Sequence, residues 1–177
     1  LLPQMLPIGD VEEDELFLTG FDQSSALATL APAISRAERL LLFTKIIMAK
    51  PIEYGIEKLA ANQACYLAQE LANLIDTVHN QGLSFDRLTD LVPEEYAVHW
   101  QETLKFLQII TEYWPQILAE RQLIDASDRR NRLLRAQIDL WRQNPPVKRI
   151  VAAGTTAAFP LMKELVKTVL SLEKGEL

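Results

Sequence analysis

Three side chains with acid–base or metal-binding chemistry stand at helical spacing in the middle of the sequence. Glu95, His99 and Glu102 are four and three residues apart, so a helix would project all three from one face. A metal or acid–base site also needs groups from a second element, and the other histidine, His79, stands near Asp76 on a separate predicted helix. Metal sites in helical bundles favour Glu-x-x-His, whereas the order here is His-x-x-Glu. A solvated helix face is therefore the favoured interpretation, and a small metal enzyme is the least favoured.

A second kind of chemistry is suggested by a glycine-containing turn. Arg149–Ala153 is a short β-rich run, Gly154-Thr155-Thr156 follows it, and a helix is predicted from Phe159 to Leu172. Backbone N–H groups at the start of such a helix attract phosphate. The G-x-x-x-x-G-K-[ST] spacing and its lysine are missing. A capped turn is therefore favoured over a nucleotide site, and we expect no cofactor in this segment.

The single cysteine does not indicate a nucleophile. Cys65 stands among Ala64, Tyr66, Leu67 and Ala68 with no basic neighbour to lower its pKa, and a small buried cysteine is the usual case. A lone cysteine forms no internal disulfide, so a reducing, cytoplasmic compartment is the simplest expectation. No Ser–His–acid motif is recognisable either, so we expect no catalytic residue.

The most suggestive polar feature is a run of basic residues on and after one predicted helix. Asp139 is the only acid among them, and three of the arginines lie near one face, opposite Leu134, Ile138 and Trp141. Such a stripe could follow the phosphates of a nucleic acid. The alternative is an exposed helix whose arginines pair with acids of neighbouring helices. The nucleic-acid candidates are Arg129, Arg130, Arg132, Arg135, Arg142, Lys148 and Arg149.

Composition and charge place the chain among ordinary globular proteins. With 177 residues, 49% hydrophobic and 24% charged, it can bury one sizeable core. No apolar run approaches the roughly 18 residues that cross a bilayer. The net charge of −6 comes from residues 1–35, which hold six acids and no Lys or Arg, so the rest is neutral. A low pI therefore says little against nucleic-acid binding, because local patches decide electrostatic contact.

The repeats of apolar residues predict a mainly α-helical fold. Ser35 and Glu38 form a capping box before a helix that Pro51 ends, and Gly82 ends the next helix. Pro115 should kink or divide a third helix, and a fourth begins after Asp125 or Ser127 and ends at Asn144-Pro145-Pro146. The apolar positions are Leu40, Phe43 and Ile47; then Leu67, Leu71, Leu74, Ile75 and Val78; and then Trp100, Leu104, Leu107 and Trp114.

The run at Arg149–Ala153 needs a partner strand, because a lone parallel-type strand leaves its backbone groups unpaired. Either Leu16-Phe17-Leu18 pairs with it, or its sheet lies outside this chain. The sequence also stops at Lys174-Gly175-Glu176-Leu177, where another strand could follow, and lacks an initiator Met. We therefore expect a segment of a larger protein.

Several stretches of the sequence, taken in order, resemble one known protein family. The opening LPQMLPIGDVEEDEL of Leu2–Leu16 is similar to its L-P-x-x-x-P-x-G-D-x-x-E-D-E-L stretch. The other similar segments are Gly82–Leu88, Val92–Glu94, His99–Gln101, Trp114–Arg121, Arg129–Leu134 and Ala152–Thr156. The family that these segments resemble is the AddB-type subunit of alphaproteobacterial AddAB helicase–nucleases. Ala157, Ala158 and Phe159 depart from the expected small or glycine residues and an aliphatic residue.

The resemblance implies a non-catalytic, helicase-like region of a DNA double-strand-break repair protein. Residues 1–34 would form an extended acidic arm, 35–144 a helical subdomain inserted into an α/β motor core, and 145–177 a strand and helix that return to that core. The partner would be an AddA-type helicase–nuclease subunit, and the nuclease carboxylates would lie outside this segment.

Two functions remain open from the sequence. The segment could guide DNA or act as a scaffold within the helicase–nuclease, or it could be a helical protein–protein module that never touches DNA. No membrane contact is expected in either case.

Overall fold

The computed structural model describes residues 30–49, 59–85 and 97–177, with the side chains of 97–102 excepted. Leu16–Leu18, Pro51, Glu95 and the side chains of His99, Trp100 and Glu102 lie outside the described residues. The described chain is mainly α-helical, as expected, and divides into two compact units, 31–128 and 129–177. The domain limits expected for the parent protein stay a prediction.

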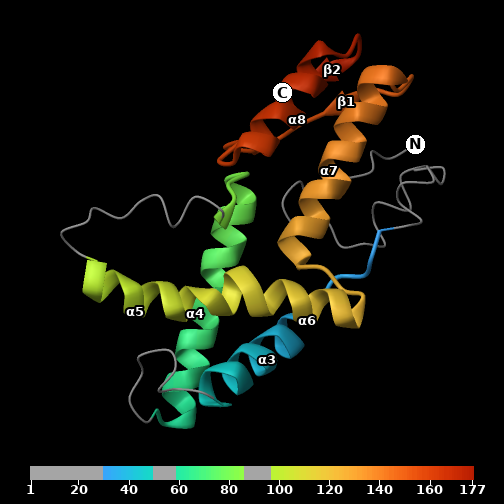
Figure 1. The fold of residues 1–177 in the computed structure, drawn as a ribbon. Coiled ribbons are helices and arrows are strands. Elements are labelled where there is room, and N and C mark those ends of the chain that lie inside the picture. The colour runs from blue at the N-terminus through green and yellow to red at the C-terminus, as the bar shows by residue number, and fades with distance from the viewer. Residues whose placement is uncertain (1–29, 50–58, 86–96) are drawn as a thin grey trace. The chain divides into compact units, whose positions relative to one another are not determined.

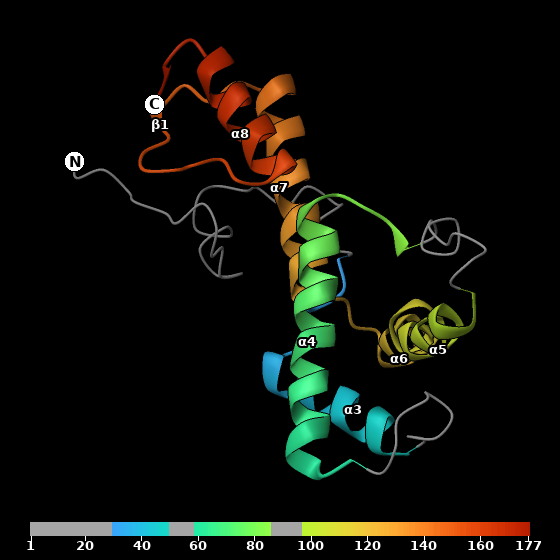
Figure 2. The same cartoon turned by 90° about the vertical axis from the view of Figure 1, so that its left-hand side faces the viewer.

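Helices α3 (Arg36–Ala49) and α4 (Ala61–Asn80) begin and end where local chemistry favours it. The Ser35 hydroxyl accepts the Glu38 N–H at 3.2 Å, which confirms the predicted helix start. Gln63 accepts the Ala60 N–H at 3.0 Å at the start of α4. After α4 the chain turns at Gly82, whose φ of 65° suits glycine and confirms the predicted stop. Figures 1 and 2 show α3 crossing the lower part of α4.

The buried stripe of α4 differs from the predicted one. Alanines carry much of it: the buried residues are Ala64, Ala68, Leu71, Ala72 and Ile75. The prediction for Leu74 was wrong, because its side chain is 38% exposed. Cys65 is also exposed rather than buried. Small residues let the helices approach closely along a stripe that a search for large apolar residues does not find.

The third predicted helix continues past Pro115 through a widened turn. It comprises α5 (Ala97–Gln108), a π-helical turn η5 (Ile109–Tyr113) and α6 (Trp114–Arg121), which run as one rod in Figure 1. The backbone N–H of Trp114 donates to the carbonyl oxygen of Ile109, five residues back. Pro115 has no N–H to donate to the preceding turn. The expected kink or division at Pro115 is therefore replaced by a π turn just before it.

The core of unit 31–128 is built from α3, α4, η5 and the start of α6. Phe43 and Ile47 are fully buried, and the rings of Phe43 and Trp114 lie 4.3 Å apart at 40°. Residues just before α3 and just after α6 are joined by backbone hydrogen bonds. The Ile34 N–H donates to Ile124 at 2.9 Å, and the Ile124 N–H donates to Pro32 at 3.1 Å. The two ends of this unit are therefore held together.

Unit 129–177 is a helix packed on a β-α-β unit. Helix α7 (Ala126–Gln143) contributes most of its length, and α8 (Pro160–Ser171) packs on it. The predicted apolar face of α7 is confirmed, because Leu134 and Ile138 are buried and Trp141 is half-buried against α8.

The predicted terminal strand has a partner inside the chain. Strand β1 (Ile150–Val151) pairs in parallel with β2 (Gly175–Glu176), with Ile150 opposite Gly175. The sequence predicted either Leu16–Leu18 or a sheet outside this chain as the partner of this strand. Among the described residues the partner is β2, a strand inside the chain, and Leu16–Leu18 lie outside the described residues. Gly175 is required here: a Cβ would stand 1.7 Å from the Val169 carbonyl oxygen.

Within the described ranges, no helix combines the length and apolar character needed to cross a membrane.

Candidate nucleic-acid interface

The structure separates the seven predicted basic residues into different environments. Arg129 is 7% exposed, so it is a buried residue and poorly placed to reach a phosphate. Arg130 is half-buried, whereas Arg132 and Arg135 are exposed on α7. Lys148 is exposed in the segment between α7 and β1. The seven residues therefore do not form a single surface.

One of the arginines forms an ion pair with a neighbouring helix, as the alternative interpretation predicts, and a second arginine pairs with a residue of β2. Arg142 of α7 bonds to Glu164 of α8 at 2.9 Å, with both side chains about half exposed. Arg149 pairs with Glu176 next to the short sheet, and the bond and charge of that carboxylate raise the pKa of Arg149. Exposed pairs of this kind contribute little stability. Both arginines are also at least half exposed to solvent.

A buried polar cluster, which the sequence did not reveal, lies in unit 31–128. Arg39 of α3 donates to Asp76 of α4 at 2.7 and 2.8 Å, and to Asp125 at 3.2 Å. The Trp114 indole N–H donates to the second oxygen of Asp125 at 2.9 Å. Ser127 bonds to His79 Nδ1 at 2.9 Å. We call Arg39, Asp76, Trp114 and Asp125 the Arg39 cluster.

The charges of the Arg39 cluster depend on one another. Burial by itself would raise the pKa of Asp76, but the hydrogen bonds and positive charge of Arg39, with smaller contributions from Ser127 and His79, hold that pKa below its usual value. Burial likewise disfavours the charged form of Arg39, and its two carboxylate partners outweigh this and raise its pKa. Because the charged groups of the Arg39 cluster bond to one another, the cluster stabilises this unit and holds its elements in position.

One signal in the sequence, not used in the prediction, could have indicated this cluster. Arg39 stands four residues before Phe43, which stands four before Ile47. An arginine on the buried stripe of a helix needs a buried anionic partner. Its partners could not be named, because they lie 37 and 86 residues away in sequence.

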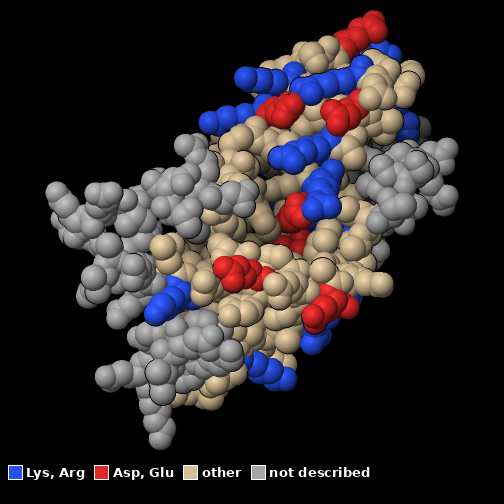
Figure 3. Space-filling model, in the orientation of Figure 1, with Lys and Arg blue, Asp and Glu red and all other residues tan. Residues whose placement is uncertain are grey.

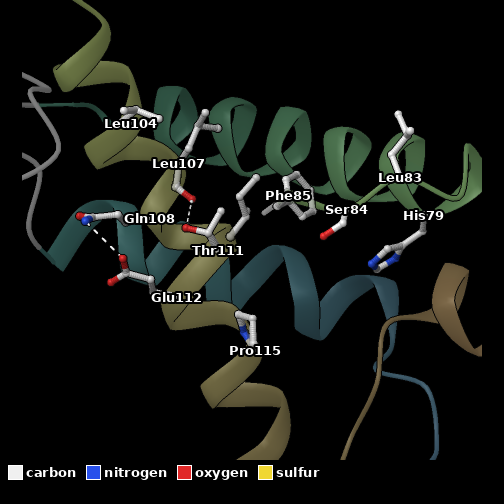
Figure 4. Close-up of a pocket in the computed structure, with 11 residues that line it drawn as sticks. His79, Leu83, Ser84, Phe85, Leu104, Leu107, Gln108, Thr111, Glu112 and Pro115 are labelled. Atoms are coloured by element: carbon white, nitrogen blue, oxygen red, sulfur yellow. Dashed lines mark hydrogen bonds between the residues drawn. The ribbon is translucent and has the colours of Figure 1, made fainter. Parts of the chain in front are cut away.

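Figure 4 shows a pocket of this unit, about 540 Å³ in volume, beside the π turn. Its walls come from α4, α5, η5, the start of α6 and the segment after Gly82. The side chains include the polar groups of His79, Ser84, Gln108 and Glu112 among leucines and Phe85. Gln108 donates to Glu112 at 3.4 Å, and Thr111 donates to the Leu107 carbonyl at 3.2 Å. Gln108 and Glu112 thus bond to each other, whereas His79 bonds to Ser127 outside the pocket lining.

The Glu95, His99 and Glu102 side chains of the predicted acid–base or metal site lie outside the described residues. No group of three or more His, Cys, Asp and Glu side chains could hold a metal ion within the described ranges. After β1, the Ala157 N–H donates to the Thr155 hydroxyl at 3.1 Å, and Ala157 has a φ of 46°. Helix α8 then begins with Pro160, which lacks one of the N–H groups that a phosphate would need. The turn therefore satisfies the Ala157 N–H with its own Thr155 hydroxyl.

Comparison of the chain with protein-family models, with curated proteins and with solved structures found no match. The class that the fold defines is accordingly broad: a mainly helical chain that ends in a parallel β-α-β unit.

Proposed function

We propose that this chain is a non-catalytic, helicase-like segment of an AddB-type subunit that repairs double-strand breaks. Its role would be to guide DNA, to act as a scaffold for an AddA-type helicase–nuclease partner, or both. The ordered sequence resemblance is the reason for proposing this family. The main structural support is the arrangement of the two ends of unit 31–128.

The backbone bridge between Ala33 and Ile124 brings the two ends of unit 31–128 together. A subdomain inserted into another domain needs this arrangement, because the host chain must leave and return at nearly the same point. Asp125, which follows the bridge, is also fixed by Arg39 and Trp114. This supports the proposal that the helical unit is an insertion.

The short sheet supports the second part of the proposal, a return into an α/β core. Parallel sheets are normally covered on both faces and contain more than two strands. Here each strand has two residues, and Val151 of β1 is 52% exposed. Val147 is 83% exposed just before β1. We infer that further protein covers this apolar surface, either the rest of an α/β core or a partner subunit.

The direct test is co-purification of the chain with an AddA-type helicase–nuclease subunit. Val151→Glu should weaken the association at least about tenfold, because it places a charge on the exposed apolar surface. Leu41→Glu is the matched control, because Leu41 is 54% exposed on α3 and lies in the other unit. Absence of association with the unsubstituted chain would contradict the scaffold role.

The second candidate is a protein–protein module of another assembly, without DNA contact. The same exposed Val147 and Val151 favour it. It is distinguished by its partner: stable association with a protein other than an AddA-type subunit, together with no measurable affinity for DNA at low salt, would select it.

A further inference from the structure

The two units carry opposite charge. Residues 129–177 contain ten Lys and Arg and four Asp and Glu, whereas residues 31–128 contain eight and fourteen. The neutrality of the chain after residue 35 is therefore an average of a basic unit and an acidic one. A local excess of this size attracts polyanions whatever the net charge of the whole chain.

The ion pair between Arg142 and Glu164 identifies the side of the α7–α8 pair on which the positive charge gathers. Arg135 lies two turns before Arg142 on α7, so both side chains project in nearly the same direction. On α8, Lys167 lies one turn after Glu164, and Lys163 lies one turn before Lys167. Figure 3 shows Lys and Arg side chains gathered over these two helices. We call Arg135, Arg142, Lys163 and Lys167 the α7–α8 basic face.

Among the described residues, three of these four cations have no ion-pair partner. Arg135, Lys163 and Lys167 are exposed, and none forms an ion pair with a residue that the structure describes. Arg142 has Glu164, but that pair is half exposed and weak enough for a phosphate to compete. Asp139 is an exposed acid of the same stretch of α7, so the face is predominantly but not wholly basic.

We propose that the α7–α8 basic face binds the sugar–phosphate backbone of a nucleic acid without reading its sequence. This rests on the proposed function and deepens it, since it replaces the seven-residue candidate set with four residues and includes two lysines of α8. The charges are spread along two helices: Arg135 and Arg142 are separated by roughly 10 Å of helix rise, several times the rise of about 3.4 Å per phosphate in a DNA strand. Trp141 is half-buried between the helices, so contact is through phosphates and not through base stacking.

The test is DNA binding by the full chain, measured by fluorescence anisotropy with a labelled single strand and a duplex between 50 and 200 mM salt. The triple variant R135Q/K163Q/K167Q should lower affinity at the lowest salt by at least about tenfold and reduce the salt slope on the single strand by about two. The control R36Q/K45Q/K105Q removes the same charges at exposed positions of the acidic unit, and it should bind as tightly as the unsubstituted chain.

Three results would overturn the proposal: no DNA binding by the unsubstituted chain, equal losses in the two triple variants, or displacement of DNA by poly-glutamate as effectively as by unlabelled DNA. The last would assign the face to an acidic protein. Co-purification with the AddA-type subunit separates this inference from the proposed function. If DNA affinity is absent and association persists, only the basic face is wrong; if association is absent and the triple variant still loses DNA affinity, only the parent assembly is wrong.

Discussion

At the scale of single residues, the Arg39 cluster sets the stability of unit 31–128. Arg39 is 7% exposed and Asp125 is 4% exposed, so removal of the guanidinium leaves a buried carboxylate without its counter-ion. The cost of breaking a buried pair by removing one partner is much larger than the net gain from forming it, because the remaining charge has lost its hydration as well as its partner.

Arg39→Met should therefore lower the free energy of unfolding by about 3–5 kcal/mol. Denaturant titration followed by circular dichroism measures this change. Arg121→Met is the matched control, because Arg121 pairs with Glu38 at 2.7 Å on an exposed surface, and its loss should cost less than about 1 kcal/mol. Equal effects of the two substitutions would show that the Arg39 cluster is not buried in solution.

The lowered pKa of Asp76 predicts that the free energy of unfolding depends on pH in the acidic range. A carboxylate with a folded pKa below its unfolded pKa stabilises the protein above the unfolded pKa of about 3.9, and this contribution disappears as pH falls through the folded pKa. The difference in unfolding free energy between the unsubstituted chain and Asp76→Asn should thus be constant near neutral pH and shrink below about pH 4. A difference that grows as pH falls would contradict the assignment.

At the scale of elements, local patterns predicted some structures and long-range packing decided others. The start of α3 followed from Ser35, and α7 and α8 followed from their apolar spacing. Strand β2 could not be predicted from the sequence, because Gly175-Glu176 has no β-branched or aromatic residue and pairs with β1 through its backbone. The π turn before Pro115 and the alanine stripe of α4 depend on how neighbouring helices pack. Of the candidate interface, the sequence supplied Arg135 and Arg142, but not Lys163 and Lys167, whose relation to α7 is tertiary.

Glycine substitutions test the β-α-β unit. Gly175→Ala should disrupt the β1–β2 pairing, because the new Cβ would overlap the Val169 carbonyl oxygen, and the cost should exceed the 1–3 kcal/mol or so of ordinary overpacking. Gly154→Ala has open space and only a strained φ of 69°, so it should cost about 1–2 kcal/mol. The Ala152 amide donates to the backbone carbonyl of Glu176 at 2.9 Å. Hydrogen exchange at this amide should accelerate far more in Gly175→Ala than in Gly154→Ala. Unchanged protection there would show that the two strands do not pair.

At the scale of the whole molecule, the described chain combines features that an isolated domain does not need. One unit has its two ends bridged by backbone hydrogen bonds, and the other has a two-stranded parallel sheet with exposed valines. An insertion into a larger α/β core accounts for both features.

The most direct test is a cryo-electron microscopy map of the parent protein assembled with an AddA-type subunit and a DNA end. The account predicts that β1 and β2 belong to a larger parallel sheet, that protein covers Val151, and that unit 31–128 projects from this core as an insertion. A map in which β1 and β2 remain a two-stranded sheet with Val151 in solvent would contradict it.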